Sequence, residues 1–273
     1  MDYTFLIKDI DYLEIEGIQL KLRIYRPEVE AKIWVMETHG GAWASNDRTS
    51  NVVLHEALAK AGIGAVGIDF RLSSQAQYPA PLQDISYAIR WFKKYASDMD
   101  IEIKKIGGLG TSSGGQQMGL IALRPNDPEY CLPAPELSNV DPSIDFFAAC
   151  WPILDPLARY HMAQDRGNQR LVNNHRKYFE NEAAMERANP FRLLVRGEET
   201  HRPPTMIIQG TADDNVNHEW QDAFAEKYIA AGGDCLVHKF EGQPHTFATK
   251  NSGDPHSKSA LKKLQDFVSA QMN

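Results

Sequence analysis

The sequence predicts an α/β protein with a mostly parallel, eight-stranded sheet and helices on both faces. Short, nearly continuous apolar runs alternate along the chain with segments in which apolar residues recur every three or four positions. The runs are typical of buried parallel strands, and the recurring positions are typical of amphipathic helices. Such alternation implies right-handed crossovers that place helices on both faces of the sheet. The chain has 273 residues, of which 42% are hydrophobic. That length supports one large core, so we expect a single domain over residues 1–273.

The first two predicted strands differ from those that follow. Residues 5–15 and 20–25 alternate apolar with polar side chains, and Gly17 separates them. This pattern favours antiparallel strands at an edge of the sheet, each exposed on one face. Residues 33–37 and 65–70 are short apolar runs, which predicts buried parallel strands.

The remaining elements continue the alternation. Helices are expected where apolar residues fall on one helical face, at 52–61, 85–96, 115–123, 220–228 and 261–268. Further buried strands are expected at 105–109, 144–151, 205–209 and 236–240. About fifty residues after Trp151 contain no predicted strand, and a structureless loop of that length would be improbable. Two helices, at 169–179 and 182–188, are predicted within this segment.

Composition excludes several classes of function. The net charge of −7 disfavours nucleic acid and anionic membranes as partners, because both require a basic surface. No apolar run approaches the roughly 20 residues that span a bilayer, and the acidic start of the chain does not resemble a secretory signal. Three scattered cysteines, Cys131, Cys150 and Cys235, indicate reduced thiols and neither a disulfide framework nor a zinc site. We therefore expect a cytoplasmic protein that binds no metal.

A candidate nucleophile stands between a predicted strand and a predicted helix. Residues 110–114 read Gly-Thr-Ser-Ser-Gly, with Ser112 at the centre. A serine on a sharp turn between strand and helix exposes its hydroxyl above the end of the sheet, and small flanking glycines permit the bend. Taken alone, the motif favours a serine that only caps a helix.

Three further motifs supply partners for this serine in a characteristic order. Residues 39–43 read His-Gly-Gly-Ala-Trp directly after a buried strand, residues 210–216 read Gly-Thr-Ala-Asp-Asp-Asn-Val, and residues 242–247 read Gly-Gln-Pro-His-Thr-Phe. Serine, then acid, then histidine is the chain order of α/β-hydrolases. From about residue 20 to the C-terminus the chain resembles α/β-hydrolase fold serine esterases, and most closely the His-Gly-Gly type related to hormone-sensitive lipase.

The resemblance implies a catalytic triad of Ser112, Asp213 and His245. The family pattern of Gly, two residues, Asp, two residues, Val selects Asp213, while the adjacent Asp214 remains as an alternative that would otherwise cap the following helix. His245 lies in a short loop after the last strand, where the family places its base. Other histidines are expected in structural positions: His238 in a strand, and the following four facing solvent from polar helices: His55, His175, His218 and His256.

The resemblance also implies an oxyanion hole formed by the backbone N–H groups of Gly40, Gly41 and Ser113. Ser113 replaces the alanine that is usual after the nucleophile, which adds a hydroxyl near the site. Trp43 and Trp151 fall at strand ends and are predicted either to wall the acyl pocket or to pack in the core. His39 is expected to brace the oxyanion loop.

In the family an insertion at approximately residues 155–200 forms a cap over the active site, and we expect the same here. The insertion is polar, which argues against a lid for long-chain fats. We therefore predict a metal-free, cofactor-free serine carboxylesterase that acts on a small-molecule ester with a short acyl chain. Two alternatives stay open: an amide, formamide or lactam hydrolase resembling kynurenine formamidase, and a non-catalytic receptor on the same scaffold. The edge strands offer a surface for a homodimer.

Overall fold

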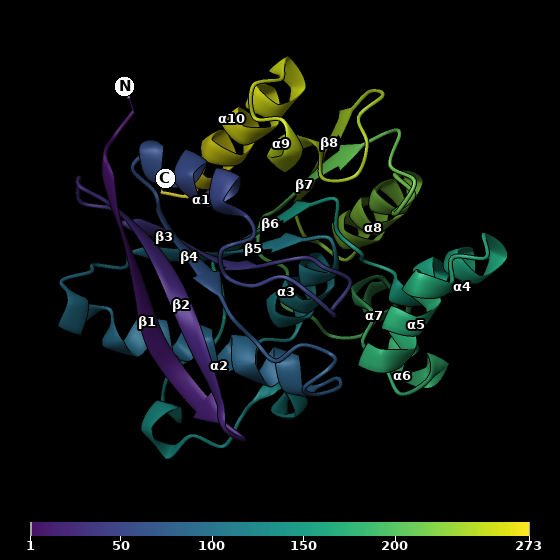
Figure 1. Cartoon of the computed structure of the whole chain (residues 1–273), viewed down its shortest axis with the longest axis horizontal. Helices are drawn as coiled ribbons and strands as arrows, with labels where there is room; N and C mark the ends of the chain where they lie inside the picture. Colours follow the sequence, from purple (N-terminus) through teal and green to yellow (C-terminus); the bar gives the residue numbers. More distant parts are fainter. Residues whose placement is uncertain (1, 273) are drawn as a thin grey trace.

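Eight strands form one sheet through the centre of the protein (Figure 1). The structure is a computed structural model that describes residues 2–272, so the expectations for Met1 and Asn273 lie outside it. The strand order is β1-β2-β4-β3-β5-β6-β7-β8. Only the pairs β1–β2 and β2–β4 are antiparallel, and the other five pairs are parallel, which confirms the mostly parallel eight-stranded sheet. The strands are β1 Phe5–Ile15, β2 Ile18–Pro27, β3 Ile33–Thr38, β4 Gly64–Ile68, β5 Lys105–Thr111, β6 Phe146–Cys150, β7 Thr205–Gly210 and β8 Cys235–Phe240.

The antiparallel hairpin at the start of the chain forms one border of the sheet. Glu16 and Gly17 connect β1 to β2 with φ angles of 52° and 75°, and two successive residues of positive φ match the right-handed twist of a tight hairpin. The predicted edge position is correct for β1. β2 pairs on its other side with β4, so it lies inside the sheet.

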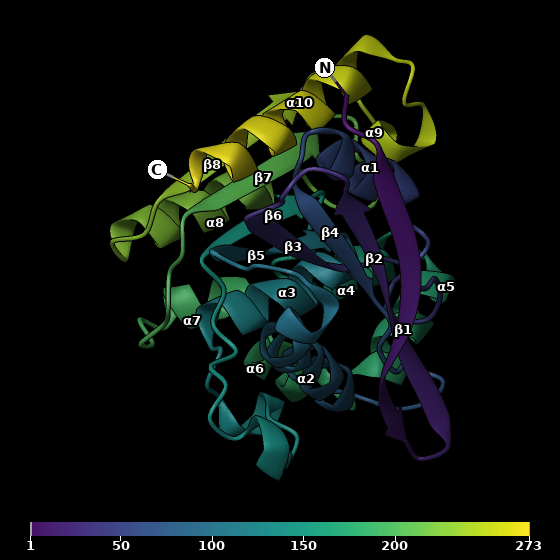
Figure 2. The ribbon, with the colours of Figure 1, turned by 90° about the vertical axis from the view of Figure 1, so that its left-hand side faces the viewer.

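Helices cover both faces of the sheet, as predicted. Successive residues of a strand point to opposite faces, and β3 shows this alternation: Val35 packs with α1 and α10, while Met36 packs with α2 and α3. Figure 2 shows α1 and α10 together on one side of the sheet and α2 and α3 on the other. The main helices are α1 Val52–Lys60, α2 Ala80–Tyr95, α3 Ser113–Leu123, α8 Glu219–Ala230 and α10 Pro255–Ala270. Shorter ones are α9 Phe247–Lys250 and the 3₁₀ turns Ser97–Met99, Pro128–Tyr130 and Pro135–Leu137.

The segment between β6 and β7 folds into four short helices that lie together at one side of the molecule (Figure 1). They are α4 Pro156–Asp165, α5 Gln169–Tyr178, α6 Glu182–Arg187 and α7 Pro190–Val195. The sequence analysis found α5 and α6 but missed α4 and α7. Both missed helices begin with proline after a capping side chain, Asp155 in one case and Asn189 in the other. Asp-Pro and Asn-Pro are start signals that apolar periodicity alone does not detect.

Two of the four histidines expected to face solvent are buried, so that prediction is wrong for His55 and His175. Both rings are fully inaccessible, whereas His218 is half-buried and His256 is exposed. His55 lies on the face of α1 that packs on the sheet and bonds to Glu37. His175 lies on the inner face of α5. The helix face decided their burial, and the polar residues beside them in the sequence were a misleading guide. Residues 2–272 contain no helix long and apolar enough to cross a membrane.

Candidate active site

Ser112 stands on a strained turn between β5 and α3. Its backbone has φ 50° and ψ −116°, a conformation that residues with a side chain rarely adopt. The two glycines of the motif permit this turn. A Cβ on Gly110 would lie 2.6 Å from the Cα of Gly115, and one on Gly114 would lie 2.1 Å from the carbonyl oxygen of Thr38. Close backbone approach therefore explains why glycine occupies both positions.

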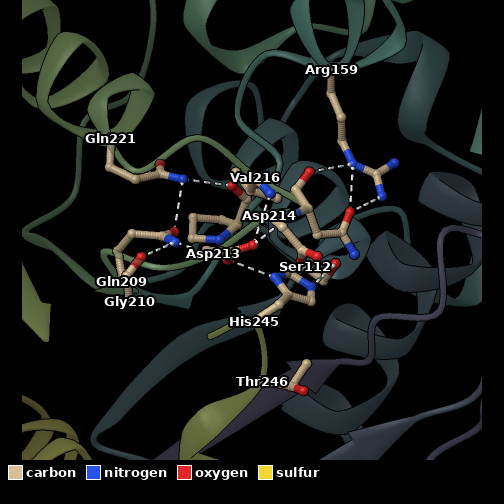
Figure 3. A network of polar contacts seen from close by, with 12 residues as sticks. Ser112, Arg159, Gln209, Gly210, Asp213, Asp214, Val216, Gln221, His245 and Thr246 are labelled. Carbon is tan, nitrogen blue, oxygen red and sulfur yellow. Dashed lines mark hydrogen bonds and ion pairs between the residues drawn. The ribbon is translucent and has the colours of Figure 1, made fainter. Parts of the chain in front are cut away.

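Three loops at the carboxyl ends of parallel strands bring the predicted triad together (Figure 3). Ser112 follows β5, Asp213 follows β7 and His245 follows β8. The Nε2 atom of His245 lies 3.1 Å from Ser112 Oγ, and its Nδ1 atom lies 2.7 Å from Asp213 Oδ2. Because a carboxylate accepts, Nδ1 carries the proton in this pair. Nε2 is then free to accept the serine proton.

Asp213 is held by hydrogen bonds to both of its carboxylate oxygens. Oδ1 accepts from the N–H groups of Asn215 at 2.8 Å and Val216 at 2.9 Å, while Oδ2 accepts from Gln209 Nε2 at 2.9 Å in addition to His245. Burial alone would raise the pKa of Asp213. The bond and charge of His245, with the bonds from Val216 and Gln209, outweigh burial and lower the pKa. The adjacent Asp214 is exposed, and it offers only its backbone oxygen, to Arg166.

Two buried glutamines support the acid, and the sequence analysis missed both. Gln209 is the penultimate residue of β7, and its amide donates to Asp213. Gln221, on the buried face of α8, donates to Gln209 Oε1 at 3.2 Å and to the Pro152 carbonyl at 2.8 Å. These hydrogen bonds fix the orientation of the Gln209 amide, so that its NH₂ group faces the Asp213 carboxylate (Figure 3). The available signal was a glutamine in an otherwise apolar strand, because buried polar groups require partners.

The loop after β3 passes directly beside the nucleophile. A Cβ on Gly40 would lie 3.0 Å from Ser112 Cβ, and Gly41 has φ 106° with only 2.2 Å between its ideal Cβ position and the Ser45 carbonyl oxygen. Within residues 2–272, neither Gly40 N–H nor Gly41 N–H meets a hydrogen-bond acceptor. Ser113 begins α3, so its N–H is among those that a helix leaves without an internal acceptor.

The hydroxyl of Ser113 does not enter the site. It is fully buried and accepts a hydrogen bond of 3.2 Å from the backbone N–H of Trp43. The extra hydroxyl thus connects the nucleophile turn to the loop after β3. His39 lies in the same loop, stacked on Phe70 at 4.3 Å between ring centroids, with Nδ1 2.8 Å from the Gly40 carbonyl. Burial lowers the pKa of His39, which keeps this ring neutral.

A second buried polar cluster lies behind the nucleophile and also escaped the sequence analysis. Asn51 donates to Glu37 Oε1 at 2.7 Å and to Thr111 Oγ1 at 2.9 Å, so it reaches the residue that precedes Ser112. His55 contacts the other oxygen of Glu37 at 3.1 Å. The only signals of this cluster in the sequence were Glu37, a polar residue in a predicted buried strand, and His55, a polar residue in a predicted amphipathic helix.

The cavity at Ser112 has a volume of about 260 Å³. It is lined by the loop after β3, by the triad loops and by the helical segment, in particular by Gly40, Gly41, Ala42, Ser45, Asn46, Asn51, Thr111, Ser112, Trp151, Arg159, Arg170, Leu171, Asn215, His245, Thr246 and Lys250. Trp151 is among these residues, and its ring lies 6.2 Å from that of His245.

Trp43 does not line this cavity. Of the two alternatives that the sequence left open, the wall of an acyl pocket is therefore wrong, and packing in the core is correct. Its ring is 1% exposed and stacks on Tyr178 with centroids 5.1 Å apart. The indole N–H donates to Gln116 Oε1 at 3.0 Å. These contacts hold the indole between α3 and α5, away from Ser112.

Comparison with known proteins agrees with this fold and with the chemistry of the motifs. The family model described as BD-FAE matches residues 22–228. The esterase LipC of Mycobacterium tuberculosis is 26% identical over 70% of this chain, and an arylesterase of Saccharolobus solfataricus is 25% identical over 86%. The chain spans about half of LipC (47% of its length) and 75% of the arylesterase.

Solved structures extend the likeness to the whole α/β-hydrolase fold. A propionate-bound esterase from the planctomycete Thermogutta terrifontis superposes with a TM-score of 0.75 at 26% identity. The match covers 98% of this chain and 94% of that esterase.

Proposed function

The chain belongs to the BD-FAE family, and we propose that it is a serine carboxylesterase that hydrolyses short-chain esters through an acyl-enzyme. One observation carries this proposal. The contacts of 3.1 Å from Ser112 to His245 and 2.7 Å from His245 to Asp213 lie beside the unoccupied N–H groups of Gly40 and Gly41. Nucleophile, base, orienting acid and oxyanion donors therefore surround one point in the cavity. The esterase names of the relatives support an ester as the substrate.

Acylation begins with proton transfer from the Ser112 hydroxyl to His245 Nε2 while the serine oxygen bonds to the ester carbonyl carbon. Negative charge then develops on the former carbonyl oxygen, which accepts hydrogen bonds from the N–H groups of Gly40, Gly41 and Ser113. One such donor typically contributes about 3 kcal/mol of transition-state stabilisation. The bond to the alcohol oxygen breaks as that oxygen takes the proton from His245.

Deacylation repeats these steps with water. His245 removes a proton from the water as its oxygen attacks the acyl carbon, and Ser112 regains the proton when the acid departs. Asp213 keeps the imidazole in the tautomer that has the proton on Nδ1. Its lowered pKa leaves the carboxylate charged at neutral pH, where it stabilises the transient imidazolium.

The size of the cavity supports a short acyl chain. A volume of about 260 Å³ lies below the usual range for drug-sized ligands, and it must hold both the acyl group and the alcohol. The propionate in the similar Thermogutta terrifontis esterase is a short acid of this kind. The helices α4–α7 would act as the cap that limits the size of the substrate.

Two further expectations remain proposals. We infer a cytoplasmic location, supported by three free cysteines, and fractionation of cells with an antibody to the chain tests it.

We infer also that two chains can pair along β1, an edge strand on which Leu6 and Ile7 are exposed. Light scattering on the purified protein tests the pairing.

Hydrolysis of p-nitrophenyl esters from acetyl to dodecanoyl, beside a p-nitroanilide of the best acyl group, tests the function. We expect turnover of the short esters, little turnover of the anilide, and loss of both in Ser112→Ala. Ser138, which is exposed and does not line the cavity, provides the matched control Ser138→Ala. Faster hydrolysis of the anilide than of the ester would replace the esterase with the amidase alternative, and undiminished turnover in Ser112→Ala would refute the mechanism.

A further inference from the structure

The cavity at Ser112 is lined by positive charge although the chain as a whole is acidic. The sequence has 36 acidic and 29 basic residues, yet no aspartate or glutamate among residues 2–272 lines this cavity. Three cationic side chains do, namely Arg159 from α4, Arg170 from α5 and Lys250 from α9. A cavity with charges of one sign concentrates ligands of the opposite sign.

Arg159 is the most unusual of these residues because it is a buried cation without a carboxylate partner. Its side chain is fully buried, and its Nε and Nη2 atoms donate to Asn215, which is neutral. Its Nη1 atom is buried and donates to no acceptor in residues 2–272. In Figure 3, Arg159 extends toward the triad, and one of its terminal nitrogens carries no dashed line.

Asp213 is the carboxylate that acts most strongly on Arg159, but it does not form an ion pair with the guanidinium. Asp213 attracts the guanidinium, but the hydrogen bonds of Asp213 go to His245, Gln209 and two backbone N–H groups. The pKa of Arg159 is lowered to about 9, because burial and the nearby charge of Arg170, which both lower it, outweigh the attraction of Asp213, which raises it. The group is therefore charged at neutral pH, next to a second cation.

The contacts that the structure describes for this cation are to neutral groups, namely Asn215 and the ring of Trp43, whose centre lies 5.9 Å from the guanidinium carbon. A buried charge without a counter-ion is costly to the fold, and the cost is offset when an anion binds. Arginine is suited to a carboxylate because its N–H groups match the geometry of the two oxygens. Arg159 and the exposed Arg170 line the same cavity as Ser112. An anion held there would share the cavity with the bond that Ser112 attacks.

We propose that the substrate is an ester that carries a carboxylate, and that Arg159 and Arg170 bind this carboxylate while Ser112 attacks the ester. This inference rests on the proposed esterase function and specifies its substrate class. The carboxylate is attached either to the acyl group or to the alcohol, since both parts of an ester occupy the cavity. In both cases the arginines select the substrate and take no part in proton transfer.

Two pairs of esters, matched except for charge, test the inference. On the acyl side we compare p-nitrophenyl hydrogen glutarate with p-nitrophenyl methyl glutarate, after subtraction of the rate in buffer. On the alcohol side we compare 4-acetoxybenzoate with methyl 4-acetoxybenzoate. A hydrogen bond to a charged group corresponds to a factor of about ten or more, so kcat/KM of the charged ester should exceed that of its methyl ester by this factor in at least one pair. Equal or better hydrolysis of the neutral ester in both pairs would overturn the inference.

Substitutions assign the selectivity to the two arginines. Arg159→Gln and Arg170→Gln should each lower the ratio of kcat/KM between charged and neutral esters by about tenfold, mainly through KM, while Arg159→Lys should retain part of it. Arg187→Gln removes an exposed charge from α6, outside the cavity, and should leave the ratio unchanged. If Arg159→Gln and Arg170→Gln lower the rates of both esters equally, the arginines do not read the carboxylate. Arg170 is exposed, so this variant keeps the test decisive even if Arg159→Gln does not fold.

A binding experiment separates this inference from the proposed function. Monomethyl glutarate should bind to Ser112→Ala at least about tenfold more tightly than dimethyl glutarate, and this preference should be lost in Ser112→Ala/Arg170→Gln. Titration calorimetry measures the dissociation constants of both compounds, and no hydrolysis is needed for the measurement. Selective binding in a protein that hydrolyses no ester would reject the esterase and keep the carboxylate site. Equal binding of the two glutarates, together with equal binding of 4-acetoxybenzoate and its methyl ester to Ser112→Ala, would reject the carboxylate site alone.

Discussion

The cavity has two sides that are built in different ways. On the side formed by the strand ends, both oxygens of Asp213 are hydrogen-bonded and the triad contacts measure 2.7 and 3.1 Å. On the side formed by α4 and α5, two buried groups, Nη1 of Arg159 and Nε2 of His175, have no partner in residues 2–272. The triad carboxylate is fully hydrogen-bonded without a ligand, whereas the helical side leaves a buried cation without a carboxylate partner.

This difference separates chemistry from selection. Bond cleavage requires atoms held at fixed distances, which rigid strand ends and glycine turns provide. Selection of a substrate requires groups whose interactions are completed only on binding, and these lie on the short helices. Substitutions on the strand side should therefore affect all esters, whereas those on the helical side should affect stability or the choice among esters.

The largest effect is expected from Asp213→Asn. An amide in this position favours the wrong imidazole tautomer, and in serine proteases the equivalent change lowers kcat by about 10⁴-fold. We expect a loss of that order for every ester, measured as kcat on p-nitrophenyl acetate. Asp214→Asn, one position along, is the matched control, because that side chain is exposed and should be replaceable. A greater loss in Asp214→Asn would show that Asp214, and not Asp213, is the acid of the triad.

The second largest effect is expected when glycine substitutions on the two sides of the cavity are compared by their kcat values. Gly41 has φ 106° and a Cβ there would lie 2.2 Å from the Ser45 carbonyl oxygen, so Gly41→Ala displaces a proposed oxyanion donor. We expect kcat to fall by about 10²-fold or more. Gly167, between α4 and α5, has φ 65° with open space around it, and Gly167→Ala should cost about 1 kcal/mol of stability with little change in kcat. Similar kcat values for the two variants would remove the distinction between the two sides.

The helical side should also determine how stability depends on acid. Burial, and then the charge of Arg159, lower the pKa of His175 from 6.5 to about 3, so the folded protein keeps this ring neutral. Below pH 6.5 the unfolded chain binds a proton that the folded chain does not, and the free energy of unfolding falls by about 1.4 kcal/mol per pH unit. The lowered pKa of Asp213 contributes only below its ordinary value of 3.8, outside this range.

His175→Phe isolates this contribution. The variant loses the contact of 2.8 Å between Nδ1 and the Leu171 carbonyl but keeps an aromatic ring of similar size. Urea unfolding between about pH 6 and pH 4 should give a pH slope that is shallower by about one proton than in the wild type. His39 and His238, whose pKa values are also lowered, titrate in both proteins and therefore cancel. Identical slopes would show that His175 is protonated in the folded state.

The smallest effect is expected at the start of α5. Asn168 caps this helix by accepting a hydrogen bond of 3.2 Å from Leu171 N–H. Asn168→Ala should lower the free energy of unfolding by about 1 kcal/mol. Asn173→Ala, on the exposed side of the same helix, should cost less. Because α5 carries Arg170 and Leu171 of the cavity, a loss of selectivity between charged and neutral esters should accompany the uncapping.

The two sides also differ in how far the sequence predicts them. Ser112, Gly40 and Gly41 stand at turns whose geometry requires particular residue types, so their motifs are visible without a structure. The sheet was predictable for a similar reason, since each buried strand is a short apolar run. Gln209 and Arg159 depend on which face of a strand or helix is buried and on what packs against it. His55 and His175 were misjudged, and the two alternatives for Trp43 were left undecided, because composition near a residue does not determine its neighbours in space.

A single acylation experiment tests the central claim most directly. Rapid mixing with p-nitrophenyl acetate, followed by acid quench and mass spectrometry, identifies the residue that carries the acetyl group. We predict a burst of one p-nitrophenolate per chain, an acetyl group on the peptide that contains Ser112, and neither in Ser112→Ala. Acetylation of a different residue, or steady hydrolysis by Ser112→Ala at the wild-type rate, would contradict the account.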